Sequence, residues 1–148
     1  MHARRCLWTV TVCILLLSTG CREEQKSFRK VVVPVKGTIT VDGKAPTSPI
    51  KIDVHLLGAA DLEHPTASSG LSDDKGAFVL STYDTGDGVP VGEYALTYFW
   101  GDFNMVSMRY GGKDKLNKRY SKPEDAVTKF KAEEGKPIDL GVVDLKTK

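Results

Sequence analysis

Apolar and polar residues alternate over much of the chain after residue 30, and this alternation predicts β-strands. The clearest strand is Ile50–Leu57, in which apolar residues alternate with Lys51, Asp53 and His55. Glu93–Trp100 is the most apolar of the predicted strands. The remaining five predicted strands are Val31–Val41, Thr66–Ser72, Ala77–Thr82, Ala126–Ala132 and Ile138–Leu145.

Two turn sequences indicate where these strands reverse. Asp42-Gly43 follows the first strand and is a strong signal for a two-residue hairpin. In the string SDDKGAFVL, we expect Asp73 to accept hydrogen bonds from turn amides and Gly76 to adopt positive φ. Phe78 then faces the core from the next strand. All five residues are therefore predicted to have structural roles.

Three further features refine the architecture. Gly92 and Tyr94, at the start of a strand, indicate a tyrosine corner, in which the tyrosine hydroxyl bonds to upstream backbone. The apolar positions of the last strand change phase near Gly141, which predicts a β-bulge. The segment 101–125 has little periodicity, and Asp114–Tyr120 could form one or two helical turns. Seven short strands joined by turns predict an all-β, antiparallel sandwich of two sheets.

Residues 1–20 have the pattern of a secretory signal peptide. Arg4 and Arg5 supply its positive charge, and the apolar run Leu7–Leu17 is shorter than the roughly 20 residues of a membrane-spanning helix. The string LSTGC, which ends at Cys21, resembles a bacterial lipobox, whose cysteine is lipidated and becomes the new N-terminus. We therefore expect an exported lipoprotein, membrane-anchored at the cell envelope in the periplasm or on the outer surface. An ordinary signal peptide with a chance cysteine and an uncleaved anchor are the alternatives.

The rest of the 148-residue chain is predicted to be one domain with a short tether. Residues 21–30 are the lipidated cysteine and a charged tether, and residues 31–148 are the folded domain. Cys6 and Cys13 would be removed with the signal peptide, so Cys21 would have no disulfide partner. The net charge of +2 comes from the two arginines of the signal peptide. The mature chain is therefore formally neutral, and general attraction to nucleic acid is not expected.

The strings VKGTITVDGKAP, SDDKGAFVL and DGVPVGEYAL resemble those of the carboxypeptidase regulatory-like, or transthyretin-like, β-sandwich domain. With the lipobox before them and LNKRYSKP after them, the layout is similar to small lipoproteins of planctomycete-type bacteria. The resemblance covers Val33–Leu145 and implies a seven-stranded immunoglobulin-like, transthyretin-like sandwich. Because its motifs are structural, the resemblance implies a fold and no particular activity.

Four aromatic residues near or within the segment 101–125 are the candidate ligand-binding residues. Exposed aromatic rings can stack on sugar faces, so a carbohydrate-binding module is the alternative function. The competing interpretation is that these rings cover the end of the hydrophobic core. The four residues are Trp100, Phe103, Tyr110 and Tyr120.

Two groups of charged residues are weaker candidates. An acidic group could bind calcium at one end of the sandwich, but its spacing matches no calcium loop, so turn formation is the favoured explanation. A basic group could meet anionic lipid or cell-wall polymer, although a solvated loop is the favoured explanation there. The acidic group is Asp73, Asp74, Asp84 and Asp87, and the basic group is Arg109, Lys113, Lys115, Lys118, Arg119 and Lys122.

Catalysis has little support in the sequence. The HExxH, GxSxG and P-loop motifs are absent, His55 lies on the polar face of a strand, and His64 lies in a loop. We therefore predict a non-enzymatic envelope lipoprotein with a binding or scaffolding role, without a cofactor or metal. The expected partners are the membrane, through a lipid anchor at Cys21, and an envelope protein or polysaccharide.

Overall fold

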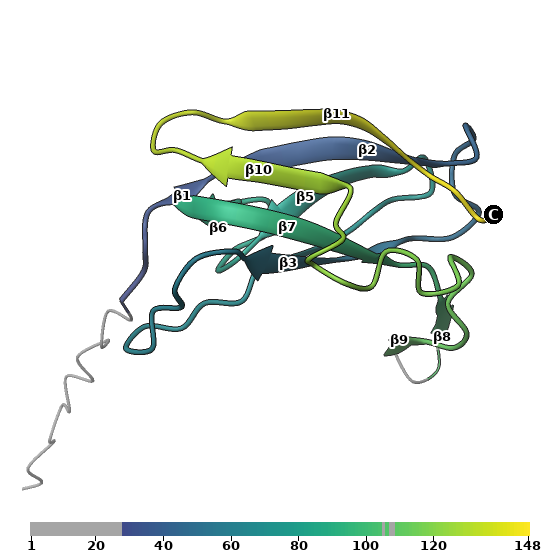
Figure 1. Cartoon of the computed structure of the whole chain (residues 1–148), viewed down its shortest axis with the longest axis horizontal. Coiled ribbons are helices and arrows are strands. Elements are labelled where there is room, and N and C mark those ends of the chain that lie inside the picture. The colour runs from purple at the N-terminus through teal and green to yellow at the C-terminus, as the bar shows by residue number, and fades with distance from the viewer. Residues whose placement is uncertain (1–27, 105, 107–108) are drawn as a thin grey trace, which may run out of the picture.

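The computed structural model describes residues 28–104, 106 and 109–148 and shows an all-β domain (Figure 1). Across these ranges, no helix is long and apolar enough to cross a bilayer. The strands are β1 (Val32–Val33), β2 (Val35–Val41), β3 (Lys51–Leu56), β4 (Ser69–Leu71), β5 (Ala77–Ser81), β6 (Val89–Pro90), β7 (Gly92–Phe99), β8 (Asp102–Asn104), β9 (Arg109–Gly111), β10 (Thr128–Ala132) and β11 (Ile138–Leu145).

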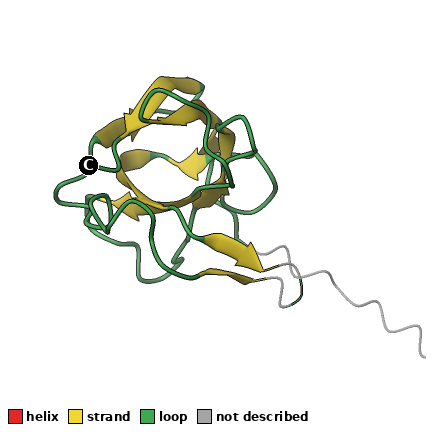
Figure 2. Ribbon diagram, turned by 90° about the vertical axis from the view of Figure 1, so that its right-hand side faces the viewer, coloured by secondary structure: helices red, strands yellow, loops and turns green. Residues whose placement is uncertain are grey.

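Seven of these strands form one sheet in the order β10-β7-β3-β4-β5-β2-β11. They correspond to the seven predicted strands, and the prediction of an all-β chain is confirmed. The sheet curves until it is nearly closed, like a barrel, so the two separate layers of a sandwich are not clearly present (Figure 2). The strands pair antiparallel except for β11, which runs parallel to β2 with Leu145 opposite Val41.

The parallel pairing of β11 corrects the prediction of a fully antiparallel fold. Although β10 and β11 are consecutive in the chain, they occupy opposite ends of the strand order. After the turn at residues 133–137, the backbone N–H of Ile138 donates to the carbonyl of Pro34 at 2.9 Å, which aligns β11 with β2. The predicted bulge in β11 is confirmed, because the register shifts around Gly141, whose φ is 65°.

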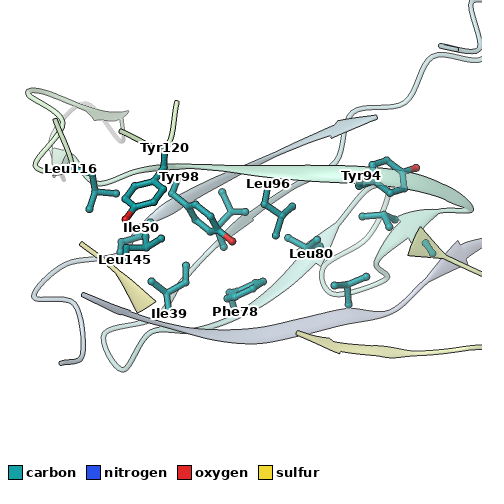
Figure 3. Close-up of a cluster of buried hydrophobic side chains, with 14 of the residues drawn as sticks. Ile39, Ile50, Phe78, Leu80, Tyr94, Leu96, Tyr98, Leu116, Tyr120 and Leu145 are labelled. Carbon is teal, nitrogen blue, oxygen red and sulfur yellow. The ribbon is translucent and has the colours of Figure 1, made fainter. Parts of the chain in front are cut away.

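Inward-facing side chains of the strands fill the interior of the sheet (Figure 3). Ile39, Ile50, Leu80 and Leu96 are fully buried, as the alternation of apolar positions predicts. Phe78 also faces inward, as predicted, and is 4% exposed. Burying one large apolar side chain contributes about 1.5–3 kcal/mol relative to leaving it in water. These positions therefore supply the main stabilisation of the curved sheet.

The hairpin turn at Asp42-Gly43 is confirmed. Both residues have positive φ, 51° and 77°, as a type I′ turn requires. The Asp144 carboxylate accepts hydrogen bonds from the Gly43 N–H and the Thr40 hydroxyl, each at 2.8 Å. The Thr147 hydroxyl donates to the Asp42 carboxylate at 2.6 Å. The C-terminal residues therefore hold this turn in place.

The predicted turn at Asp73–Gly76 is also confirmed. The Asp73 carboxylate accepts hydrogen bonds from the N–H groups of Lys75 at 2.9 Å and Ala77 at 2.8 Å. Gly76 has a φ of 87°, and its carbonyl accepts a hydrogen bond from the Ile39 N–H at 2.8 Å. A Cβ at this position would overlap the Ile39 carbonyl oxygen. The close approach of this turn to β2 therefore requires glycine.

The tyrosine corner predicted at Tyr94 is wrong in one respect. Tyr94 is buried, so its structural role stands, but its hydroxyl makes no hydrogen bond to backbone within the described residues. Gly92 and Tyr94 lie in β7, which pairs with both β10 and β3 at this level. The Tyr94 side chain is on the inward face of β7, so its ring is part of the core, stacked on Phe130 with ring centroids 5.7 Å apart.

Candidate functional site

The segment 101–123 caps one end of the long axis of the domain (Figure 1). Strands β8 and β9 form a hairpin there, with Asp102 opposite Gly111, although the sequence pattern did not predict it. The helical turns considered over Asp114–Tyr120 are not present. Asn117 and Lys118 have positive φ, 56° and 60°, which breaks a right-handed helix and produces consecutive tight turns.

Asp114 organises this cap and is only 6% exposed. Its carboxylate accepts three backbone hydrogen bonds, from Trp100 at 3.1 Å, Leu116 at 3.0 Å and Lys118 at 2.8 Å. The Lys115 N–H also donates to the Trp100 carbonyl at 2.9 Å. One buried carboxylate therefore joins the end of β7 to the turns that follow β9. The sequence pattern did not predict the link to Trp100, because this hydrogen bond joins residues that are 14 positions apart.

Tyr120 is a core residue and not an exposed ligand-binding residue. It is 8% exposed, its ring packs edge-on against Tyr98 with centroids 6.3 Å apart, and its hydroxyl accepts a hydrogen bond from the Lys146 N–H at 2.8 Å. Leu116 from the same turns is fully buried. Burial raises the pKa of Tyr98 to about 12, and the Tyr98 hydroxyl donates to Thr128 at 2.8 Å. The cap thus closes the end of the core.

Trp100 and Tyr110 are half-buried and hold the cap to neighbouring strands. The Trp100 indole N–H donates to the Ser48 hydroxyl at 2.9 Å, and the Lys115 ammonium lies 5.3 Å from the indole ring centroid. The Tyr110 hydroxyl donates to the carbonyl of Pro49, and burial raises the pKa of Tyr110. The side chain of Phe103, the fourth predicted aromatic, lies outside the described part of the structure. The four predicted aromatics therefore do not form one exposed platform.

A groove of about 410 Å³ lies between the cap and the outer face of β3 and β7. Its floor includes two cross-strand pairs, in which Lys51 lies opposite Phe99 and Asp53 lies opposite Thr97. The alternation in the sequence placed these polar side chains on the outer face. It did not predict the groove, because the wall consists of cap residues that have no periodic pattern. The wall residues are Tyr110, Gly111, Asp114, Lys118 and Ser121.

The groove combines an ion pair, hydroxyl groups and aromatic rings. The Lys51 ammonium lies 2.8 Å from the Asp53 carboxylate, and both side chains are partly exposed. The Thr97 hydroxyl is 2.8 Å from the imidazole of His55. The rings of Phe99 and Tyr110 meet edge-on with centroids 5.7 Å apart. Such a surface can bind a polar ligand by hydrogen bonding and by stacking.

Lys51 and Tyr110 also line a second depression, of about 420 Å³, over β4 and β5. Because both residues line the two depressions, a ligand longer than the groove could continue from one into the other. The second depression is lined mainly by small or hydroxylated residues. These are Ser69, Gly70, Leu71, Ser81 and Thr85.

Three of the four aspartates considered for calcium, Asp73, Asp84 and Asp87, hold loops of the fold. The Asp73 carboxylate holds its own turn, and Asp84 pairs with Arg29. Burial raises the pKa of Asp87, but three hydrogen bonds from backbone N–H groups outweigh it, so the pKa is lowered overall. Within the described ranges, no three His, Cys, Asp or Glu side chains lie close enough together to hold a metal ion.

The basic group is partly engaged in contacts within the cap. Lys115 forms an ion pair with Asp102 at 2.7 Å, and the Arg119 guanidinium donates to the carbonyl of Lys148. Lys118 lines the groove described above. These contacts favour a structural role for Lys115 and Arg119, whereas Lys118 lines the candidate groove.

Cys21 and the signal-peptide pattern lie outside the described residues.

The chain matches no protein-family model, and no curated protein matches it significantly. Among solved structures, a 9R-lipoxygenase from Cyanothece PCC8801 aligns at 14% identity with a TM-score of 0.36. That alignment covers 77% of this chain and 16% of the lipoxygenase chain. A similarity this low carries no argument about fold or activity.

Proposed function

We propose that the protein is a non-enzymatic, exported lipoprotein, anchored in the envelope membrane at Cys21, whose β-domain presents a binding groove to envelope components. The supporting sequence features are the signal-peptide pattern of residues 1–20 and the lipobox-like LSTGC string. At the finer level, we propose that the domain is a transthyretin-like relative of the β-sandwich, on the strength of its turn motifs.

The observation that carries this proposal is the position of the groove relative to the chain entry. Residues 28–30 enter at one end of the long axis, and the cap lies at the other (Figure 1). The groove is beside the cap, because residues of the cap line it. The Lys30 ammonium pairs with Asp61 at 2.8 Å, and its backbone N–H donates to the Tyr83 hydroxyl at 3.0 Å. The Arg29 guanidinium pairs with Asp84. A tether that starts at this end therefore places the groove at the end of the domain far from the anchor.

The groove is suited to binding and not to bond cleavage. The Ser121 hydroxyl donates to the Lys118 carbonyl at 2.8 Å, and Lys51 is occupied by Asp53. The Thr97 hydroxyl lies 2.8 Å from the His55 imidazole, but Thr97 is only 6% exposed, which disfavours it as a nucleophile. We propose an envelope protein or a polysaccharide as the partner, with no cofactor and no nucleic acid.

A carbohydrate-binding module remains the second candidate, and one observation favours it. Phe99 and Tyr110 lie in the groove beside the polar pair Lys51–Asp53, which is the combination of apolar and polar groups that a sugar ring requires. Phe99 then takes the place of Tyr120 among the candidate sugar-binding rings, because Tyr120 is buried in the core.

The anchor is tested by detergent-phase partitioning of the full-length protein expressed in a bacterial host. We expect the wild-type protein in the detergent phase and the Cys21→Ser variant in the aqueous fraction, because the variant cannot carry a lipid. Cys13→Ser is the matched control and should behave as wild type. A Cys21→Ser variant that stays in the membrane would show that the anchor lies elsewhere.

The groove is tested on arrays of envelope polysaccharides with the detergent-solubilised lipoprotein. We expect Lys51→Ala to lose any binding that the wild type shows. Lys36→Ala is the matched control, because Lys36 also lies on a strand and pairs with an aspartate, Asp139, at 3.4 Å outside the groove. Binding to none of the polysaccharides would remove the carbohydrate alternative, and equal binding by both variants would remove the groove as its site.

A further inference from the structure

Apolar side chains are exposed at the end of the domain where the chain enters. Leu62, in the loop between β3 and β4, is 89% exposed, and Phe28 is 59% exposed. Soluble surfaces seldom gather large apolar side chains in one place without a partner. We call this surface the entry face, and it consists of Phe28, Val31, Leu57, Leu62 and Val91.

Contacts link the segments of the chain that carry the entry face. The Phe28 ring packs on the His64 ring with centroids 3.9 Å apart, next to Leu62 in the β3–β4 loop. The Leu57 N–H donates to the Glu93 carbonyl at 2.8 Å, which joins that loop to the start of β7. Val91 lines a hollow of about 340 Å³ with residues of this loop and with Lys30. Figure 1 shows the β3–β4 loop beside the entering chain.

Charges near the entry face are largely neutralised within the protein. Lys30 pairs with Asp61 at 2.8 Å, and the hydrogen bond from Lys30 holds the pKa of Asp61 at about 2. Arg29 pairs with Asp84. Each of these pairs is neutral overall, so they leave no excess positive charge that would require an anionic lipid. Glu63, next to Leu62, is exposed and would keep the loop at the depth of the headgroups.

The chain that precedes Phe28 indicates what covers this face. Cys21 is seven residues before Phe28, so a lipid at Cys21 can lie at most about 25 Å from it along an extended chain. Such a short tether keeps the entry face close to the bilayer surface. Moving exposed leucine and phenylalanine side chains from water into the boundary between headgroups and acyl chains is favourable.

We propose that the entry face rests on the membrane, with Leu62 and Phe28 in the headgroup–acyl boundary. This inference rests on the proposed anchor at Cys21. Contact at the entry face would fix the orientation of the domain, so that the groove at the opposite end always points away from the bilayer. Lipidation alone would attach the chain without fixing its orientation.

The cysteine content of the chain permits a direct test with the mature lipoprotein. Cys6 and Cys13 leave with the signal peptide, and the lipid blocks the Cys21 thiol, so one introduced cysteine is the only free thiol. We would label Leu62→Cys with a polarity-sensitive fluorophore and reconstitute the protein in phosphatidylcholine vesicles. Val142→Cys is the matched control, because Val142 is 69% exposed on β11, outside the entry face.

We expect the label at residue 62 to shift its emission to shorter wavelength and to lose most of its emission when the vesicles carry shallow nitroxide lipids. The label at residue 142 should show neither effect. Equal behaviour of the two labels on protein that floats with the vesicles would overturn the inference and leave the anchor intact. Protein that does not float with the vesicles would overturn both the anchor and the inference.

Discussion

The Tyr120 hydroxyl accepts a hydrogen bond at 2.8 Å from the backbone N–H of Lys146, the residue that follows β11. This bond joins the tight turns of the cap to the last strand of the sheet. The sequence motif around Gly92 and Tyr94 predicted a tyrosine with a similar role at the start of β7. In the structure, Tyr120 is the tyrosine that links a loop to backbone distant in the chain.

Removing the two hydroxyls should therefore have unequal effects. We expect Tyr120→Phe to lower the free energy of unfolding by about 1 kcal/mol, because the Lys146 N–H loses its acceptor. Tyr94→Phe is the matched control and should change it by less than about 0.5 kcal/mol. Urea unfolding followed by Trp100 fluorescence measures both. The reverse order of effects would restore the tyrosine corner at Tyr94.

Replacing Asp114 should loosen the cap while the sheet stays folded. The Asp114 carboxylate accepts hydrogen bonds from three backbone N–H groups. In Asp114→Asn, the amide NH₂ must face at least one of these N–H groups, which then loses its acceptor. We expect the free energy of unfolding to fall by about 2 kcal/mol and hydrogen exchange at the Lys118 amide to become faster. Asp125→Asn, at an exposed turn residue, is the control. Equal unfolding midpoints for the two variants would contradict the role of Asp114.

The two glycines of the hairpin turns should differ sharply in their tolerance of a side chain. Gly43 has positive φ but open space around it. Gly43→Ala should therefore lower the free energy of unfolding by about 1–2 kcal/mol, through the left-handed backbone conformation alone. Gly76→Ala adds an overlap with the Ile39 carbonyl and should cost more than about 3 kcal/mol. Thermal melts of both variants measure the difference. Similar melting temperatures would show that the Gly76 turn can move away from β2.

Stability should fall in acid, partly through Asp144. Hydrogen bonds from Lys146, Gly43 and Thr40 lower its pKa from 3.8 to about 2 in the folded chain. A carboxylate with a lowered folded pKa stabilises the fold above its unfolded pKa, and this contribution is lost as pH falls from about 4 to 2. We expect Asp144→Asn to be less stable at neutral pH and to lose less on acidification. Parallel curves of melting temperature against pH for the two proteins would contradict this.

The strands and their turns could be predicted because their signals are local. Alternation around Ile50 and Leu96 identifies the buried face of β3 and β7, and the Asp42-Gly43 pair specifies its hairpin from two residues alone. The parallel pairing of β11 with β2 could not be predicted in this way. It depends on where the chain goes after the turn at 133–137, and a single strand pattern does not encode that choice.

The candidate groove was only half predictable. Alternation placed Lys51 and Asp53 on the outer face of β3, and this is confirmed. The wall of the groove depends on Asp114, whose contact with Trp100 joins the end of a periodic strand to a segment without periodicity. The burial of Tyr120 also follows from packing on Tyr98 and not from any local pattern. A ring in a non-periodic segment can therefore be a core residue as readily as a binding residue.

The proposed lipid anchor at Cys21 is the central claim of this account, and it is tested most directly by mass spectrometry of the N-terminal peptide. The protein would be extracted from its native membrane with detergent and digested. We predict that the peptide begins at Cys21, lacks residues 1–20, and carries the added mass of a diacylglycerol group on the cysteine. A peptide that retains residues 1–20, or a Cys21 with a free thiol, would contradict the anchor.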